Sequence, residues 1–269
     1  MTPVAPLCVT NGRVLHADGT IAPGAVRCER DRIVAVGPEV APREGDRVHD
    51  ARGLLITPGL VDYGVFAIDK PAFHFGGITR AALMPDQNPP LDVSARVRFA
   101  ASSGKPDFWV HPLAAATREL QGELLAEVAL MRDAGARGIA TGRRWIDNSG
   151  TMLRLCQYAA MLGMVVCTHA EDAGVTGSAV ASAGEMATRL GLPAAPAAAE
   201  ALAISRDLAL AELAGCPVMQ GTGRQWNFPT THPQYVGPLG FLGGMRESLA
   251  GYDVILAIGT GNFFNSLFY

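Results

Sequence analysis

The sequence of 269 residues lacks the features that mark several classes of protein. Its net charge is −3, and no run of Lys or Arg is interleaved with aromatic residues, so it has no electrostatic footprint for nucleic acid. No apolar window reaches membrane-spanning length without a charge, Gly or Pro, and the N-terminus lacks a basic start followed by an apolar core. We therefore expect a cytoplasmic protein that binds neither nucleic acid nor a membrane.

Cysteine is scarce and scattered. There are five cysteines and no C-x-x-C pair: Cys8, Cys28, Cys156, Cys167 and Cys216. An odd, dispersed set is typical of small buried apolar side chains, and it argues against a disulfide or zinc framework. Apolar residues, by contrast, are abundant, at 49% of the chain with a mean hydropathy of +0.19. This composition indicates a globular α/β protein with a large core.

Two patterns divide residues 1–220. Short β-prone runs separated by turn signals at Asn11-Gly12, Asp18-Gly19 and 29–31 predict a small antiparallel β domain over residues 1–57. From the apolar run 54–66 onward, strand-like and helix-like patterns alternate, which predicts parallel βαβ units and favours a TIM-type barrel over a doubly wound sheet. Further barrel strands are expected at 78–84, 108–113, 138–141, 164–169 and 217–220.

The helices between these strands can also be anticipated. Apolar residues at a spacing of three or four predict one helix that includes Leu120, Leu124, Val128 and Met131. Only residues 67–77 separate the first two barrel strands, whereas a parallel crossover needs about a dozen residues, so the first helix must be a stub or a loop. Asp147, Asn148 and Ser149 are typical of the N-cap of a following helix.

Several phrases of the sequence resemble known proteins. TPGLVD (57–62) resembles the barrel entry of the amidohydrolase superfamily. Residues 7–215 are similar to long-chain dihydroorotases, through GGITRAALMPDQNPP (76–90), MRDAGARGIATG (131–142), the THAED-containing run 149–172 and the run 184–212. The resemblance implies a β-sandwich-like N-terminal domain over 1–57, a partial (β/α) barrel over 58–215, and zinc-dependent hydrolysis of a cyclic amide in pyrimidine biosynthesis.

The residues at the family's metal positions do not match that chemistry. The resemblance places a His-x-His pair at Gly64 and Phe66, a bridging carboxylate or modified lysine at 140–142, and a further His near 219–222. None of these positions holds a side chain suited to binding zinc, and fewer than three protein ligands rarely hold the ion. Zinc is expected from the family, but we expect it to be absent or weakly bound here.

Two candidate site residues remain. His169, in THAED, stands where the resemblance places a metal ligand, and it is the sole remaining ligand position. Asp86 stands where the family has a polar amide that binds substrate, and Ile68 stands where it has a cation; a like charge and an apolar side chain disfavour a carboxylate substrate. No catalytic residue is predicted. His74 and His111 are interpreted as surface or loop residues.

The last part of the chain departs from this pattern. Residues 216–262 resemble the central domain of thiamine-diphosphate enzymes, through FPTTHPQYVGPLGF (228–241) and the strand-like 252–258. The resemblance implies a Rossmann-like α/β tail over 216–269 that extends a truncated barrel. We expect 252–258 to pair in parallel with 217–220 through a crossover helix at 238–249. An activating Glu and a Gly-Asp-Gly motif are missing, so no thiamine diphosphate binding is expected.

Three functions are consistent with these features. The first is a non-catalytic dihydroorotase homologue, and the resemblance then implies aspartate transcarbamoylase, or a second copy of the chain, as the partner. The second is an active metal-dependent hydrolase of cyclic amides. The third is a mosaic whose tail serves as an oligomerisation module. The missing metal ligands favour the first.

Overall fold

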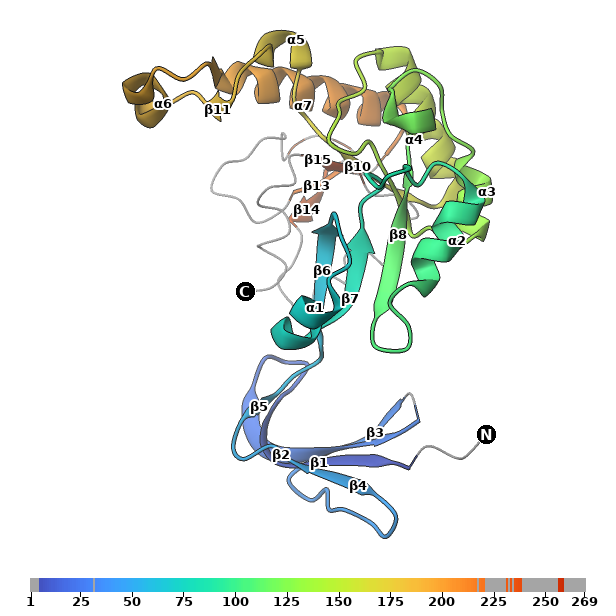
Figure 1. Cartoon of the computed structure of the whole chain (residues 1–269), viewed down its shortest axis with the longest axis vertical. Coiled ribbons are helices and arrows are strands. Elements are labelled where there is room, and N and C mark those ends of the chain that lie inside the picture. The colour runs from blue at the N-terminus through green and yellow to red at the C-terminus, as the bar shows by residue number, and fades with distance from the viewer. Residues whose placement is uncertain are drawn as a thin grey trace. The chain divides into compact units, whose positions relative to one another are not determined.

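The computed structural model describes residues 5–30, 32–216, 218–220, 231, 233, 235–238 and 256–258. The chain divides into two compact units, residues 1–59 and 60–269, and each is described by itself (Figure 1). Within the described residues, every helix is too short or too polar to cross a membrane.

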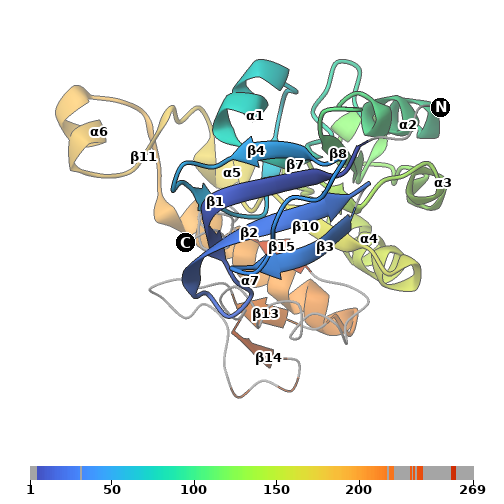
Figure 2. The ribbon, with the colours of Figure 1, turned by 90° about the horizontal axis from the view of Figure 1, so that it is seen from below.

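The first unit is a five-stranded sheet. Figure 2 shows its four main strands side by side in the order β3-β2-β1-β4, and β5 also pairs with β1. Strand β1 is antiparallel to β2 and parallel to β4 and β5. The strands are β1 (Leu7–Leu15), β2 (Ile21–Glu29), β3 (Arg32–Gly37), β4 (Arg47–Asp50) and β5 (Leu55–Ile56).

The turn predicted at Asn11-Gly12 is wrong. β1 runs through both residues, and the register with β2 shifts between Val9 and Gly12, so the pair forms a β-bulge. Asn11 has a φ of 55°, a conformation that Asn tolerates better than most residues. A Cβ on Gly12 would lie 2.3 Å from Cδ1 of Ile56, so a larger residue there would have to displace the Ile56 side chain of β5.

A buried ion pair joins β2 to the loop before β4. Nε of Arg27 lies 2.8 Å from Oδ2 of Asp46 and Nη2 lies 2.9 Å from Oδ1, a two-point contact between side chains that are 7% and 1% exposed. Glu29 also pairs with Arg27. The Arg27 hydrogen bonds, together with one from the backbone N–H of Arg43, lower the pKa of Asp46 to about 2.

The second unit is built on a six-stranded sheet in the order β15-β10-β9-β8-β7-β6, in which all neighbours are parallel. From β6 to β10, each strand lies beside the next in sequence, as in one half of a TIM-type barrel. The predicted barrel strands therefore form, apart from the last. The strands are β6 (Leu60–Val65), β7 (Ile78–Leu83), β8 (Trp109–Ala115), β9 (Gly138–Ala140), β10 (Val165–Thr168) and β15 (Leu256–Ile258).

The helices between these strands differ in length. The stub predicted for the first crossover is confirmed as α1, which Asp69 caps through its Oδ1 and which Gly77 ends at a φ of 69°. Figure 1 shows α2 and α3 beside β8, and α4 packs on α7. The helices are α1 (Lys70–Gly76), α2 (Ser94–Ser102), α3 (Val128–Asp133), α4 (Ser149–Leu162), α5 (Ala173–Thr176), α6 (Glu185–Leu190) and α7 (Ala197–Leu213).

Only part of the predicted helix with Leu120 and Leu124 forms. The 3-10 turn η1 (Arg118–Leu120) is followed by Gly122 at a φ of 82°, and α3 begins at Val128. Leu120 itself has a φ of 57°, which breaks the helical path. Asn148, in contrast, caps α4 as predicted, because its Oδ1 accepts from the N–H of Thr151 at 2.9 Å.

A single apolar core lies between the sheet and its helices. Side chains from β8, β9 and β10 meet residues of α2, α3 and α4. The larger members include Val97, Phe108, Val128, Met131, Ile139, Met152, Leu155 and Val166, each no more than 2% exposed. This core fixes the strand ends from which the candidate site is built.

The tail is arranged differently from the prediction. Strand β13 (Val218–Gln220) pairs in parallel with β14 (Tyr235–Pro238) in a separate two-stranded sheet, so it is not the sixth barrel strand. β15 pairs with β10, because the edge of β10 offers an unpaired strand of the main sheet. β15 of the tail thus extends the barrel sheet at β10, and not beside residues 217–220 as predicted. The crossover helix predicted for 238–249 falls on β14 at Pro238 and otherwise lies outside the described residues.

Candidate functional site

The candidate site lies at the carboxyl ends of the parallel strands. Phe66 follows β6, Asp86 lies in the loop after β7, Arg143 lies in the loop after β9, and His169 follows β10. In TIM-type barrels, active sites gather at this end of the sheet. The structure therefore brings both predicted site residues, Asp86 and His169, to the expected edge.

Asp86 links the loop after β7 to the loop after β9 by a hydrogen bond. Its Oδ1 accepts a hydrogen bond from the backbone N–H of Arg143 at 2.8 Å. Gly142 has a φ of 73°, and a Cβ there would lie 2.8 Å from the same Oδ1. The buried Oδ2 of Asp86 has no hydrogen-bond partner among the described residues. Asp86 thus has a structural contact that the sequence reasoning did not foresee, and its predicted role in substrate binding stays a prediction.

Arg143 covers the ring of Phe66. The guanidinium carbon lies 3.9 Å from the ring centroid, within the range of a cation–π contact. The backbone around the ring is also fixed, because Nε2 of Gln87 donates to the carbonyl of Phe66 at 3.1 Å and to that of Met84 at 3.0 Å. The position that the family resemblance assigns to a histidine therefore carries a hydrophobic ring beneath a positive charge.

His169 is held from two sides. Its backbone N–H donates to Oγ1 of Thr141, at the end of β9, at 2.9 Å. Its Nε2 lies 3.1 Å from Oε2 of Glu171, and the imidazole is 42% exposed. Because a carboxylate only accepts, Nε2 must carry the shared proton. Oε1 of Glu171 accepts from Thr176, so this carboxylate is held at both oxygens.

A buried carboxylate under this edge was missed by the sequence reasoning. Asp207 of α7 is 0% exposed and accepts from Oγ1 of Thr168 at 2.8 Å and from Arg206 at 2.6 and 3.0 Å. The guanidinium carbon of Arg206 also lies 3.6 Å from the ring centroid of Trp145, and Arg206 donates to the backbone carbonyls of Ile146 and Asp147. The available signal was an Asp on the helical face shared with the buried residues Ala203 and Leu210.

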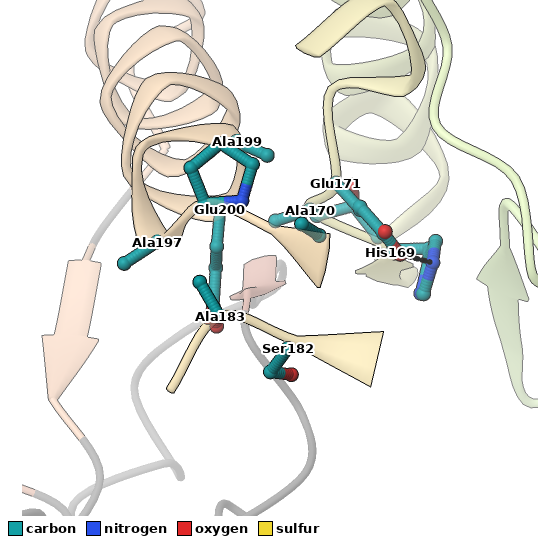
Figure 3. A pocket seen from close by; sticks show the side chains of 11 residues that line it. His169, Ala170, Glu171, Ser182, Ala183, Ala197, Ala199 and Glu200 are labelled. Carbon is teal, nitrogen blue, oxygen red and sulfur yellow. Dashed lines mark hydrogen bonds and ion pairs between the residues drawn. The ribbon is translucent and has the colours of Figure 1, made fainter. Parts of the chain in front are cut away.

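A pocket of about 340 Å³ opens beside His169. Its walls are residues 168–171 after β10, Ser182 and Ala183 at β11 (Ala181–Ser182), and residues around the start of α7, which follows β12 (Ala194–Ala195). Figure 3 shows Glu200 extending from α7 toward Ala183, with the Glu171–His169 pair on the opposite side. The pocket thus combines two carboxylates, an imidazole and the hydroxyls of Thr168 and Ser182.

The two other histidines predicted for the barrel region, His74 and His111, lie on α1 and in β8. His74 lies on α1 and is exposed, as predicted for a surface residue. His111 lies within β8, not in a loop, and its Nε2 is 3.4 Å from Nη1 of Arg80. Partial burial and the charges of Arg80 and Arg137 lower the pKa of His111. A lowered pKa keeps this imidazole neutral to a lower pH than usual.

The described residues do not fit the zinc centre that the fold implies. They contain no group of three or more His, Cys, Asp or Glu side chains placed to hold a metal ion. Gly64 lacks a side chain, Phe66 lies beneath Arg143, and Thr141 uses its hydroxyl to accept from His169. His169 and Glu171 bond to each other, and two such groups fall short of the three protein ligands that zinc sites require.

Comparison with solved structures identifies the fold class. An L-hydantoinase from Arthrobacter aurescens superposes with a TM-score of 0.65 at 22% identity, covering 94% of this chain and 58% of that one. A D-hydantoinase from Thermus sp. superposes with a TM-score of 0.59 at 18% identity, covering 93% and 57%. The parallel half-barrel therefore has the fold seen in these hydantoinase structures.

Sequence comparison then identifies the family. The dihydro-orotase-like family model matches residues 55–219, and the chain belongs to this family. It is 33% identical over 228 residues to a dihydroorotase from Geobacter sp. (strain M21), covering 79% of this chain and 53% of that protein. It is 34% identical over 221 residues to a dihydroorotase-like protein from Pseudomonas putida, covering 75% and 48%. The chain spans about half the length of these relatives. The thiamine-enzyme resemblance of 216–262 stays a prediction.

Proposed function

We propose that this chain is a dihydroorotase-like protein that does not hydrolyse cyclic amides and acts instead as a structural partner of aspartate transcarbamoylase. The observation that carries the proposal is the state of the His-x-His position, where Gly64 offers no ligand and Arg143 covers Phe66 at 3.9 Å. A guanidinium at this place repels a divalent cation, and without a bound metal a water molecule keeps a pKa far above neutral.

The electrostatics of the edge also disfavour the family's carboxylate-bearing substrate. Asp86 presents a carboxylate at the position of the family's amide, and Ile68 replaces the cation. Both changes remove favourable interactions with an anion. The residues at the family's metal positions and the changes at Asp86 and Ile68 thus support the same conclusion independently.

A role in binding another protein is supported by exposed apolar side chains near α6. Val180, Met186 and Leu190 are 71%, 61% and 64% exposed and lie within eleven residues of sequence. Exposed apolar side chains that gather in one region often mark a protein contact. Aspartate transcarbamoylase is the partner we propose, and self-association is the alternative.

The test combines metal analysis, an activity assay and a binding assay. The purified chain is incubated with zinc, freed of unbound ion, analysed for metal, and assayed for dihydroorotate hydrolysis. We expect less than one zinc per ten chains and no turnover. Turnover that a chelator abolishes and that His169→Asn removes would contradict the proposal and support an active hydrolase.

Partner binding is measured separately by sedimentation of the chain with and without aspartate transcarbamoylase. We expect a complex that Met186→Glu and Leu190→Glu weaken, because each places a charge in the apolar region. The exposed Leu124→Glu is the control, since Leu124 is 64% exposed but lies elsewhere in the sequence. A complex that forms equally well with all three variants would refute the proposed contact.

A further inference from the structure

The pocket beside His169 has an acidic lining, which neither metal-dependent hydrolysis nor partner binding uses. Its volume of about 340 Å³ lies within the range of small-molecule sites. Among the described residues that line it, Glu171 and Glu200 are acidic, His169 is the single basic group, and Lys and Arg do not occur. An anionic ligand would therefore lack a guanidinium or ammonium partner and would face two carboxylates.

The polar groups of the pocket mainly accept hydrogen bonds. Glu200 is exposed, its carboxylate has no hydrogen bond or ion pair to the described residues, and its side chain extends toward Ala183 (Figure 3). Because Nε2 of His169 donates to Glu171, Nδ1 is the ring nitrogen left to contact a ligand. The hydroxyl of Ser182 can accept as well. A ligand for this set needs several N–H donors.

A metal ion does not meet this requirement as well as an organic cation does. Glu171 is already bonded to His169 and Thr176, and the described residues place no three metal-binding groups together. A planar amidinium or guanidinium can instead donate two parallel hydrogen bonds to one carboxylate. It would also leave the His169–Glu171 pair intact.

We propose that this pocket binds a small organic cation with N–H donors, of the amidinium or guanidinium class, and that Glu200 is its anchoring residue. The carboxylate of Glu200 accepts hydrogen bonds from the N–H groups of the ligand. The Glu171–His169 pair supplies negative charge and an acceptor on the other side of the pocket. The apolar walls formed by Ala170, Ala183 and Ala199 contact the flat faces of the ligand. The proposal is independent of whether the chain hydrolyses cyclic amides.

The experiment uses three probes of one shape and different charge: benzamidine, benzamide and benzoate. Binding to the 269-residue chain is measured by ligand-observed NMR at low salt, because screening weakens exposed charge pairs. We expect benzamidine to bind with a millimolar or lower Kd, benzamide more weakly and benzoate not at all. Benzoate binding as tightly as benzamidine, or no binding of benzamidine, would overturn the proposal.

Three variants locate the site. Glu200→Gln keeps the shape of the side chain and should weaken benzamidine binding about tenfold, which corresponds to about 1.4 kcal/mol. Ala183→Leu should weaken it by filling the pocket without changing a charge. Glu123→Gln, an exposed glutamate outside the pocket, is the control and should have no effect. Unchanged binding to both pocket variants, with circular dichroism like that of the parent chain, would show that the cation binds elsewhere.

Discussion

Removing the Asp207 carboxylate should strongly destabilise the second unit. Asp207 is fully buried, and Arg206, whose side chain is 17% exposed, lies 2.6 Å from it. Breaking a buried ion pair by deleting one partner costs about 3–5 kcal/mol. Arg206 keeps two backbone carbonyls as acceptors, so for Asp207→Ala we expect the lower end of that range, about 3 kcal/mol. The contacts from Trp145 to Asp207 measure 3.4 Å and add little.

The chain contains a matched control for this change. Arg132 and Asp133 are also consecutive and lie 3.1 Å apart, but their side chains are 43% and 65% exposed. An exposed pair contributes about 0–1 kcal/mol, so Asp133→Ala should change the free energy of unfolding by less than about 1 kcal/mol. The two variants therefore differ in burial more than in local sequence.

The measurement is equilibrium unfolding in urea, followed by tryptophan fluorescence, with Trp145 beside the altered residue. The free energy is taken from the midpoint and the slope of each transition. Asp207→Asn, which keeps an oxygen for Thr168, should fall between the other two variants, at about 1–2 kcal/mol. If the losses for Asp207→Ala and Asp133→Ala differ by less than about 1 kcal/mol, the buried pair does not stabilise the fold more than an exposed pair does.

Four further changes test other parts of the structure. Because the pKa of Asp46 is lowered, its ion pair stabilises the first unit at pH values above the unfolded pKa of about 3.9, and this stability is lost as the pH falls toward 2. Asp46→Asn should therefore make the stability of the unit less dependent on pH in acid unfolding monitored by circular dichroism. An unchanged pH profile would refute this prediction. Gly142→Ala should cost about 1–2 kcal/mol because of the positive φ and the contact with Asp86, a result that an unchanged melting temperature would contradict. Asn148→Ala should cost about 1 kcal/mol through loss of the N-cap, and Asn148→Asp should restore it; equal losses for both would rule out the cap. Burial raises the pKa of Cys167 to about 11, so a disulfide reagent at pH 8 should label this half-buried thiol much more slowly in the folded chain than in the unfolded chain, and equal rates would contradict the raised pKa.

The sequence predicted the features that depend on local or periodic signals. The alternation of strands and helices, the stub at α1 and the cap at Asn148 each follow from neighbouring residues. Asn11-Gly12 was misread because the same dipeptide suits a hairpin turn and a bulge, and the choice between them was made by packing of Gly12 against Ile56. Leu120 has the right spacing for a helix, but Gly122 ends that path.

The candidate site was predictable only where a motif marked it. His169 was identified through THAED and lies at the end of β10, as expected. The contacts of Arg143 with Phe66, and of Asp207 with Thr168, join residues that are 77 and 39 positions apart. A single sequence contains no signal for such pairs, since each residue alone resembles an ordinary surface cation or a helix-borne acid.

The stacking of Arg143 on Phe66 means that gaining a metal ligand at residue 66 would involve more than one side chain. Replacing Phe66 by histidine would introduce an imidazole but would also remove the ring that supports the guanidinium, leaving a positive charge free to approach that imidazole. Moving the guanidinium away requires a change in the loop that Asp86 and Gly142 hold in place. A protein with only one of these substitutions would therefore have lost the stack of Arg143 on Phe66 without gaining a metal site. Selection that acts on one substitution at a time would then preserve the stack.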